Sequence, residues 1–417
     1  MRYIADLHIH SKYSRATSQK LNFSELTKWA SLKGINLLAT ADFTHPFWMT
    51  EIKKNLEEDG SGFLVPKDSE NNIKYIFSVE ISNIFQKAGK LRKIHTLILS
   101  PDLKTTEEIN QALGKIGKLA SDGRPIFGQD IYDTVKTLWS INPKIIVIPA
   151  HIWTPWFSLF GSRSGFESIE ECFEDLTPKI FALETGLSSD PAMNWRISSL
   201  DKYSLVSNSD AHSGQKLGRE ANVFDIPEKE LSFDLLSEIL EKKDNRFIST
   251  IEFYPEEGKY HFDGHRNCEI VFSPEETKKH KSICPKCKRF LTVGVMNRVD
   301  TFADRKVGYI PKNTPKVRHI IPLMEIISDV IGVGVSSKAV SDTYFKLIDS
   351  FNNEFKILLG VDYIDLEKVT DAKTAQAIIN VREGKVNIKP GYDGEFGKIS
   401  VDKTILKETE NKQIKLF

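Results

Sequence analysis

Histidine and carboxylate residues recur beside short apolar runs in the first half of the chain. The first run ends in Asp6-Leu-His8-Ile-His10. The full set is His8, His10, Asp42, His45, Glu80, His95, His151, Asp210 and His212. Imidazole nitrogens and carboxylate oxygens are ligands for zinc, manganese or iron. A single histidine of this kind is more often an ordinary core residue, but nine such residues at six runs predict a site for several metal ions.

The apolar runs have the length of strands, and helical patterns lie between some of them. We expect seven strands, at residues 2–10, 35–43, 73–82, 93–101, 144–152, 180–186 and 203–212. The third is expected to end at Glu80, and one helix to begin after Asn22 and end at Gly34. This alternation predicts an α/β fold with a parallel sheet, open or closed into a barrel. In a barrel the carboxyl ends of the strands share one face, so the nine polar residues would converge there.

The composition is that of an ordinary globular protein. The 417 residues carry 57 Lys and Arg against 57 Asp and Glu, so the whole chain gives no indication of a nucleic-acid partner. Its apolar runs are shorter than a membrane span, and its four cysteines form no disulfide framework. We therefore expect a cytoplasmic protein, with no membrane partner.

The cysteines indicate a second metal site. His265-Arg-Asn-Cys268 is followed by Cys284-Pro-Lys-Cys287, a spacing typical of a tetrahedral structural zinc. Among nearby histidines, His265 is preferred to His261 or His280 because it repeats the two-residue spacing. Residues 259–320 hold 14 Lys and Arg against 6 Asp and Glu, a net charge of +8. A basic module on a neutral chain favours a polyanionic partner, although a solvated face is the plainer explanation.

An aromatic loop follows His151. It contains Trp153, Trp156, Phe157, Phe160 and Arg163. Such residues are often core, but beside a metal site they could form a surface that wedges into or stacks on nucleic acid. The segment from Glu184 onward contains Asn194 and Arg196, which could line a pocket or bind phosphate.

Two glycines mark a candidate helix-hairpin-helix. Gly332-Val-Gly334 lies between helical patterns, and Lys338 follows it. The hairpin of such a motif binds DNA phosphates through backbone amides. An ordinary glycine turn between helices explains the pattern equally well.

The dispersed motifs of residues 1–225 resemble the PHP (polymerase and histidinol phosphatase) domain. Its motifs occur here in order, from Asp6-Leu-His8-Ile-His10 to Ser209-Asp210-Ala-His212, although Ala41-Asp42-Phe-Thr-His45 departs from the usual Thr-Asp-His. The resemblance implies a distorted (β/α)7 barrel with two or three metals that hydrolyses phosphate esters. A first metal would be held by His8, His10, Glu80 and Asp210, which would be the catalytic residues. A second would be held by Glu80, His95 and His151, and a third by His212 with His45 or Asp42.

Most of the chain resembles the endonuclease Q family. The matching segments are residues 151–165, 184–196, 264–268, 291–294, 322–327 and 390–394. The resemblance implies a metal-dependent DNA repair endonuclease. Such an enzyme cuts on the 5′ side of deaminated bases (uracil, hypoxanthine, xanthine) or abasic sites and leaves 3′-hydroxyl and 5′-phosphate ends. Its DNA substrate would place the protein at the nucleoid.

The last residues resemble a clamp-binding peptide. Gln413-Ile-Lys-Leu416-Phe417 is similar to the peptide by which bacterial proteins dock on the sliding clamp, although a tail packed on its own domain is the alternative.

The sequence therefore divides into five expected parts. These are a PHP barrel (residues 1–225), a helical connector (226–258), a basic zinc module (259–315), a helical DNA-binding domain (316–400) and a flexible tail (401–417). The expected cofactors are two or three divalent barrel metals (Zn, Mn, Mg or Fe) and one structural zinc. The competing hypotheses are a small-molecule phosphoesterase of the histidinol-phosphatase kind and a non-catalytic DNA-binding protein.

Overall fold

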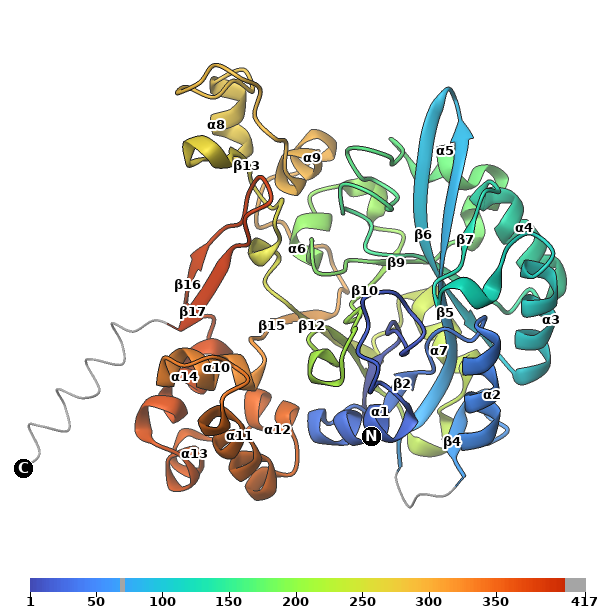
Figure 1. Ribbon diagram of the computed structural model, residues 1–417, viewed down its shortest axis with the longest axis horizontal. Helices are drawn as coiled ribbons and strands as arrows, with labels where there is room; N and C mark the ends of the chain where they lie inside the picture. Colours follow the sequence, from blue (N-terminus) through green and yellow to red (C-terminus); the bar gives the residue numbers. More distant parts are fainter. Residues whose placement is uncertain (68–71, 402–417) are drawn as a thin grey trace, which may run out of the picture.

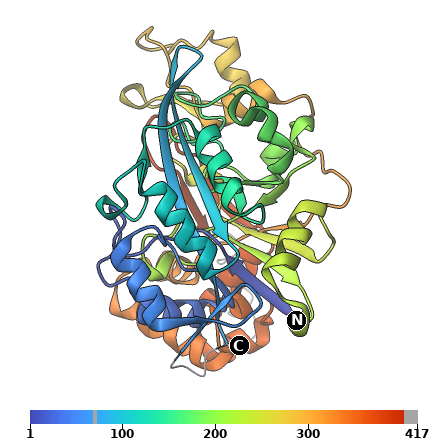
Figure 2. The same ribbon diagram turned by 90° about the vertical axis from the view of Figure 1, so that its right-hand side faces the viewer.

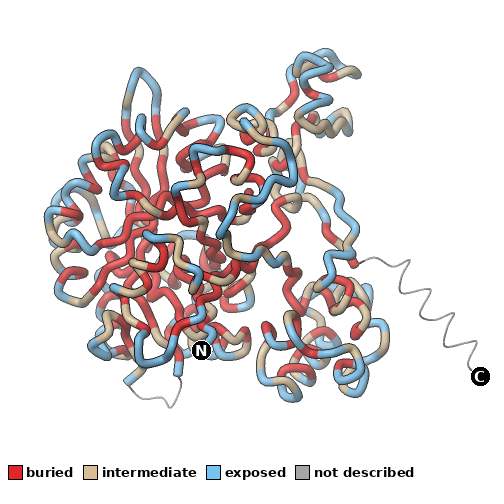
Figure 3. The backbone as a smooth tube through the Cα atoms, turned by 180° about the vertical axis from the view of Figure 1, so that it is seen from behind, coloured by how far each residue is buried: buried red, intermediate tan, exposed pale blue. Residues whose placement is uncertain are grey.

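The computed structural model describes residues 1–67 and 72–401. A large α/β body fills one side of the molecule, a small module with α8 lies at one end, and a helical domain lies beside the body (Figure 1). Buried segments concentrate in the strands of the α/β body, whereas the small module is mostly exposed or intermediate (Figure 3). None of the helices in the described part of the chain is both long and apolar enough to cross a bilayer.

Seven strands form the ring of the α/β body. They are β1 (Arg2–Asp6), β2 (Leu37–Ala39), β5 (Lys74–Lys87), β6 (Lys90–Ser100), β8 (Ile146–Pro149), β9 (Ala182–Glu184) and β10 (Ser204–Val206). β1, β2 and β5 pair in parallel, as do β9 and β10. The ring closes where Ile9 forms a parallel bridge with Ala211. All seven expected strands are present, and the fold agrees with the expected distorted barrel.

The expectation that the third strand ends at Glu80 is wrong. β5 continues to Lys87 and returns as β6, which is antiparallel to both β5 and β8. This hairpin extends beyond the barrel (Figures 1 and 2). The run of β-branched and aromatic residues from Ile76 to Phe85 favours a strand throughout, and the turn at Ala88-Gly89 has positive φ at both residues.

Helices cover the outside of the ring. They are α1 (Phe23–Lys33), α2 (Pro46–Asn55), α3 (Leu103–Leu113), α4 (Ile131–Ile141), α5 (Ile169–Phe173) and α7 (Phe233–Lys242), whereas α6 (Pro191–Asn194) follows β9 and contacts α9. The expected first helix is confirmed: the Asn22 side chain accepts a hydrogen bond from the amide of Glu25, and Gly34 ends the helix with φ of 89°.

The sheet extends past the ring. Its further strands are β3 (Leu56–Glu58), β4 (Leu64–Pro66), β7 (Ile126–Phe127), β11 (Ala221–Asp225), β12 (Phe247–Glu252) and β15 (Lys316–His319). β12 pairs with β11, which pairs with β1. The connector of residues 226–258 is therefore not purely helical, because its second half is a strand of the main sheet.

The module and the helical domain follow. The module contains β13 (Asp263–His265), β14 (Ile270–Phe272), α8 (Pro274–Lys279) and α9 (Val295–Phe302). The domain contains α10 (Leu323–Ile331), α11 (Lys338–Phe351), α12 (Glu354–Leu359), α13 (Tyr363–Val369) and α14 (Ala372–Arg382). The hairpin β16 (Val386–Lys389) and β17 (Lys398–Val401) links them, since the Asp393 carboxylate at its tip accepts a hydrogen bond from the amide of Arg266 at 2.6 Å. The buried ion pair of Lys33 with Glu354, 2.7 Å long, ties the helical domain to α1.

Candidate active site

Two groups of metal-ligand side chains meet inside the barrel. The first is His8, His10, Glu80 and Asp210, and the second is Glu80, His95 and His151. Within each group the potential ligand atoms lie within 4.8 Å of one another. Glu80 belongs to both. Its Oε2 faces Nε2 of His10 at 3.3 Å, and its Oε1 faces Nε2 of His151 at 3.0 Å. One carboxylate therefore has an oxygen for each group.

The barrel brings these residues together from five places in the chain. His8 and His10 follow β1 and alternate as in a strand, so their rings lie on the same side. Glu80 lies within β5, and His95 lies in β6 opposite Ser82. His151 and Asp210 follow β8 and β10. His95 thus reaches the site from the middle of a reversed strand and not from a carboxyl end.

The backbone is strained where several of these residues lie. His151 and Asp210 have φ of 31° and 47°, and Asp42 has φ of 39°. Gly186, with φ of 61°, lies so close that a Cβ there would come within 2.4 Å of the His151 Cβ. Non-glycine residues adopt positive φ at a cost, and such strain collects at functional sites. The local conformation is therefore consistent with residues held for chemistry.

Each histidine of the first group has a carboxylate behind it. Nδ1 of His8 donates to Glu184 at 2.9 Å, and Nδ1 of His10 contacts Asp42 at 3.2 Å. These contacts leave Nε2 of both rings directed at Glu80 and Asp210. Metal-binding histidines commonly have such partners, which fix the tautomer and the ring orientation.

The donor atoms fit metal ions. Nε2 of His8, Nε2 of His10 and Oδ1 of Asp210 are buried and make no hydrogen bond with any described residue. Buried polar atoms without partners are costly unless a ligand satisfies them. Burial lowers the pKa of His95 to about 4, so this ring is the neutral form that a metal requires. Burial opposes ionisation of Glu80, but the Arg124 guanidinium and the surrounding histidine rings outweigh it and hold the pKa of Glu80 well below its usual range.

The residues expected to hold a third metal lie outside these two groups. The Asp42 carboxylate accepts hydrogen bonds from Ser11 and Ser14 as well as contacting His10. The His45 ring stacks on Tyr13, with centroids 4.2 Å apart. The His212 ring lies 4.5 Å from that of His10, and its Nδ1 donates to the Asp210 carbonyl. Asp42 thus orients His10, while His212 remains beside the first group.

The chain is similar to several known proteins. The family model of the MJ0043 C-terminal domain matches residues 322–385. Uncharacterized protein MJ0043 of Methanocaldococcus jannaschii is 37% identical over 253 residues, which is 60% of this chain. The alignment spans 31% of that relative, so the chain matches about a third of its length. Uncharacterized protein YqxK of Bacillus subtilis is 29% identical over 412 residues, or 95% of this chain and 98% of the relative.

Two solved structures match nearly the whole chain. One is the lesion-specific endonuclease PfuEndoQ from Pyrococcus furiosus, with a TM-score of 0.85 and 29% identity over 98% of this chain and 97% of that chain. The other is endonuclease Q in complex with a 27-mer duplex that has an abasic lesion at the active site, with a TM-score of 0.84, 29% identity and 98% of both chains covered. The chain is therefore similar to endonuclease Q along nearly its whole length. This similarity and the two ligand groups support the expected class of enzyme, a metal-dependent endonuclease.

The structure also contains the expected cysteine cluster. The ligand atoms of His265, Cys268, Cys284 and Cys287 lie within 4.8 Å of one another. The two other candidate histidines, His261 and His280, are not part of this cluster. The His261 side chain is buried, and the His280 ring stacks on Phe272 with centroids 4.6 Å apart. A set of three cysteines and one histidine is typical of a structural zinc site. Arg298 of the same module donates to the Phe160 carbonyl, which fastens the module to the aromatic loop.

The aromatic loop separates into a core part and an exposed part. Trp153 and Phe160 are buried, and both rings pack on Phe302. Trp156 is 42% exposed, with the Arg163 guanidinium 6.0 Å from its ring centroid. The Phe157 ring lies 4.7 Å from that of His95, which places this loop against the second ligand group. The core explanation therefore holds for Trp153 and Phe160, whereas Trp156 remains available to a partner.

Asn194 and Arg196 do not reach the surface, contrary to the expectation that they bind DNA. Asn194 is fully buried and accepts a hydrogen bond from Nε1 of Trp153 at 2.8 Å. Arg196 is 8% exposed and forms an ion pair with Asp300. Both residues are buried because α6 and Arg196 pack between the aromatic loop, through Trp153, and the module, through Asp300.

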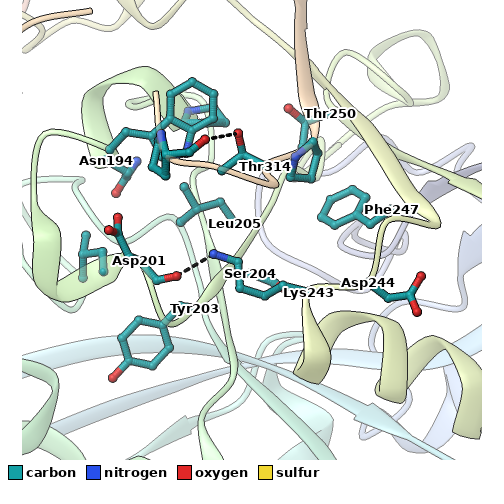
Figure 4. Close-up of a pocket in the computed structure, with 15 residues that line it drawn as sticks. Asn194, Asp201, Tyr203, Ser204, Leu205, Lys243, Asp244, Phe247, Thr250 and Thr314 are labelled. Atoms are coloured by element: carbon teal, nitrogen blue, oxygen red, sulfur yellow. Dashed lines mark hydrogen bonds between the residues drawn. The ribbon is translucent and has the colours of Figure 1, made fainter. Parts of the chain in front are cut away.

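Asn194 lines a small cavity to which no residue of the two metal-ligand groups contributes. Leu205, Phe247 and Thr314 contribute to its lining, and Lys243 donates a hydrogen bond to the Asp201 carbonyl at its edge (Figure 4). Its volume of about 30 Å³ suits one or two water molecules and not a nucleobase.

The candidate helix-hairpin-helix has the expected shape. α10 ends at Gly332 with φ of 77°, and α11 begins at Lys338 after the Ser337 cap. Gly332 and Gly334 are exposed, and a Cβ at either would meet nothing within 4 Å. Neither glycine is needed for packing, so an exposed turn remains free for a ligand. The expected clamp peptide, Gln413, Leu416 and Phe417, lies outside the described residues.

Sequence reasoning missed the roles of two residues at the site. The sequence marked Glu184 only as the start of a segment that could line a pocket or bind phosphate, but this carboxylate accepts hydrogen bonds from Nδ1 of His8 and from the His151 amide, each at 2.9 Å. Arg124 was not singled out, yet its Nη1 lies 2.8 Å from Oε2 of Glu80. Glu184 ends β9 and could have been recognised from that position, whereas nothing near Arg124 in the sequence marks it.

Proposed function

We propose that this protein is a DNA repair endonuclease that cuts the phosphodiester on the 5′ side of deaminated bases (uracil, hypoxanthine, xanthine) or abasic sites. The observation that carries the proposal is the pair of ligand groups that share Glu80 inside a chain similar along its length to endonuclease Q. A sugar phosphatase needs neither a basic zinc module nor a helical domain, so both features favour a polynucleotide substrate.

The barrel residues would hold two divalent ions, Zn, Mn, Mg or Fe, at the two ligand groups. Such ions supply hydroxide at neutral pH and neutralise charge on phosphoryl oxygens. Glu184 and Asp42 keep His8 and His10 oriented, and Glu80 fixes the spacing between the groups. No protein nucleophile is required, and the products would be 3′-hydroxyl and 5′-phosphate ends. A third ion near His212, with His45 or Asp42, stays a prediction.

Three exposed regions are the proposed DNA contacts. Trp156, Phe157 and Arg163 belong to the loop that contacts the second ligand group through Phe157, and Gly332 and Gly334 lie in the turn before α11, whose first residue is Lys338. The module, where a structural zinc would be held by His265, Cys268, Cys284 and Cys287, adds basic side chains. Gln413, Leu416 and Phe417 are proposed to dock on the sliding clamp, which would keep the enzyme at the nucleoid.

A nicking assay tests the proposal. The protein is incubated with Mn²⁺ or Mg²⁺ and an end-labelled duplex that carries one deoxyuridine, deoxyinosine or abasic site. We expect a nick 5′ of the lesion, a 3′ end that a polymerase extends, and no cut in the undamaged duplex. His8→Ala should abolish nicking while duplex binding persists, because it removes a ligand and no surface contact.

Two results would overturn the proposal. Release of phosphate from histidinol phosphate without nicking would indicate a small-molecule phosphoesterase. Binding of the duplex with neither reaction, at measured full metal content, would indicate a non-catalytic DNA-binding protein.

A further inference from the structure

Arg124 places a positive charge against the carboxylate that the two ligand groups share. Its Nη1 lies 2.8 Å from Oε2 of Glu80, whose side chain is fully buried. The Arg124 side chain itself is 26% exposed. It therefore reaches from solvent to the centre of the site.

The backbone of Arg124 is fixed by the elements that fix His10. The Asp122 carboxylate accepts hydrogen bonds from the amides of Arg124 and Arg15. The Gly123 amide donates to the Tyr13 carbonyl at 3.0 Å. A Cβ at Gly123 would come within 2.2 Å of Oδ2 of Asp42, so a larger residue would collide with the carboxylate that contacts His10. The backbone that carries Arg124 is therefore held against the segment that holds His10.

The exposed fractions of the side chains show which residues of the site a substrate can reach from solvent. The side chains of His8, His10 and Glu80 are fully buried. Asp210 and His212 are 25% and 32% exposed, similar to Arg124. A phosphate in solvent can therefore reach Asp210, His212 and the Arg124 guanidinium, whereas His8, His10 and Glu80 lie behind them.

The chemistry of arginine suits a phosphate at this place. A guanidinium has five N–H donors in a fixed plane, and it pairs with two oxygens of a phosphate at once. In Arg124, Nη1 faces Glu80. With divalent ions at the two ligand groups, the charge of Glu80 is shared with them, and the other donors of Arg124 can face an anion.

We propose that Arg124 binds a non-bridging oxygen of the scissile phosphate and holds it over the two ligand groups. This inference rests on the proposed function. The alternative is that Arg124 only neutralises Glu80 and so supports the ligand site.

Three variants separate these roles: Arg124→Gln, Arg124→Lys and, as a control with the same change of charge, Arg246→Gln. Arg246 pairs with Asp244, its neighbour two residues earlier, after α7. Melting curves establish that each variant is folded. The measurements are metal content, single-turnover nicking of the lesion duplex and inhibition of nicking by inorganic phosphate. The affinity of the metal-free protein for the duplex is measured in chelator.

We expect Arg124→Gln to keep its metals, to nick about 100- to 1,000-fold more slowly and to need at least tenfold more phosphate for inhibition. Its metal-free form should bind the duplex more weakly with a smaller dependence on salt, because one phosphate contact is lost. Arg124→Lys should restore part of the rate, and Arg246→Gln should match the unaltered protein.

Loss of metal from Arg124→Gln with unchanged sensitivity to phosphate would overturn the inference and assign a supporting role. Nicking by Arg124→Gln at the unaltered rate would also overturn it. If the unaltered protein itself does not nick, the proposed function has failed, and the metal-free binding data would still show whether Arg124 contacts a phosphate. If Arg124→Gln does not fold, the metal content, nicking rate and phosphate sensitivity of Arg124→Lys are compared with those of the unaltered protein instead.

Discussion

Glu184 accepts a hydrogen bond from Nδ1 of His8 at 2.9 Å and thereby connects the end of β9 to the end of β1. The same carboxylate accepts hydrogen bonds from Nδ2 of Asn208 and from the His151 amide, each at 2.9 Å. These donors fix the orientation of the Glu184 carboxylate, so Nε2 of His8 remains the ligand atom. An outer carboxylate of this kind raises the basicity of a metal-binding histidine.

Glu184→Gln should therefore weaken metal binding. The amide keeps the size of the side chain but removes the charge that supports His8. We expect the affinity of the barrel for Mn²⁺ or Zn²⁺ to fall about 10- to 100-fold. Isothermal titration calorimetry of the metal-free protein with either ion measures this affinity. The matched control is Glu228→Gln, because Glu228 is exposed. An unchanged affinity would show that Glu184 has no such role.

Cys284→Ser should remove the zinc of the module and leave the barrel metals in place. Cys284 is the buried cysteine of the cluster, and a structural zinc site does not tolerate the loss of a thiolate. Mass spectrometry of the purified protein should show about one zinc fewer per chain. The module should become sensitive to protease, and nicking should weaken.

The control is Cys172→Ala, because Cys172 is buried in the core of the α/β body. It should retain all of its metals. Equal zinc content in the two variants would argue against a zinc at the cluster.

Trp156→Ala should weaken binding of the lesion duplex. This indole is 42% exposed in a loop that contacts His95, and a base stacked on an aromatic ring contributes about 1–3 kcal/mol. We expect an affinity about 10- to 100-fold lower by fluorescence anisotropy in chelator. Trp156→Phe keeps a flat ring and should restore most of the affinity. Full affinity in Trp156→Ala would mean that no base stacks there.

Glu252→Gln should stabilise the protein at alkaline pH. Glu252 is fully buried, its Oε1 has no hydrogen-bond partner among the described residues, and burial raises its pKa to about 8. Between its unfolded pKa near 4.5 and about 8 the folded state binds more protons, so stability falls as the pH rises through this window. Glutamine cannot ionise and avoids this loss.

The measurement is the melting temperature of both proteins at pH 5.5 and pH 8.5. We expect the variant to gain about 2–4 °C relative to the unaltered protein at the higher pH and little at the lower. The exposed Glu228→Gln serves as the control. A difference that is the same at both pH values would contradict ionisation of Glu252 as its cause.

The sequence determined which residues could bind metal and the order of the strands that carry them. His8, His10, Asp210 and the module cysteines were recognisable because metal ligands have few chemical types and because neighbouring ligands have local spacing. The helix from Phe23 to Lys33 was equally recognisable, since Asn22 and Gly34 are local signals.

Only the tertiary structure decided how distant parts of the chain meet. The contact of Glu184 with His8 and that of Arg124 with Glu80 join residues 176 and 44 positions apart, for which no local pattern exists. Burial decided the rest: Trp153 and Trp156 are the same residue type three positions apart, yet one is core and the other is exposed. Residue type fixes the chemistry a side chain can perform, but packing between segments distant in sequence fixes whether it meets a ligand, a neighbour or water.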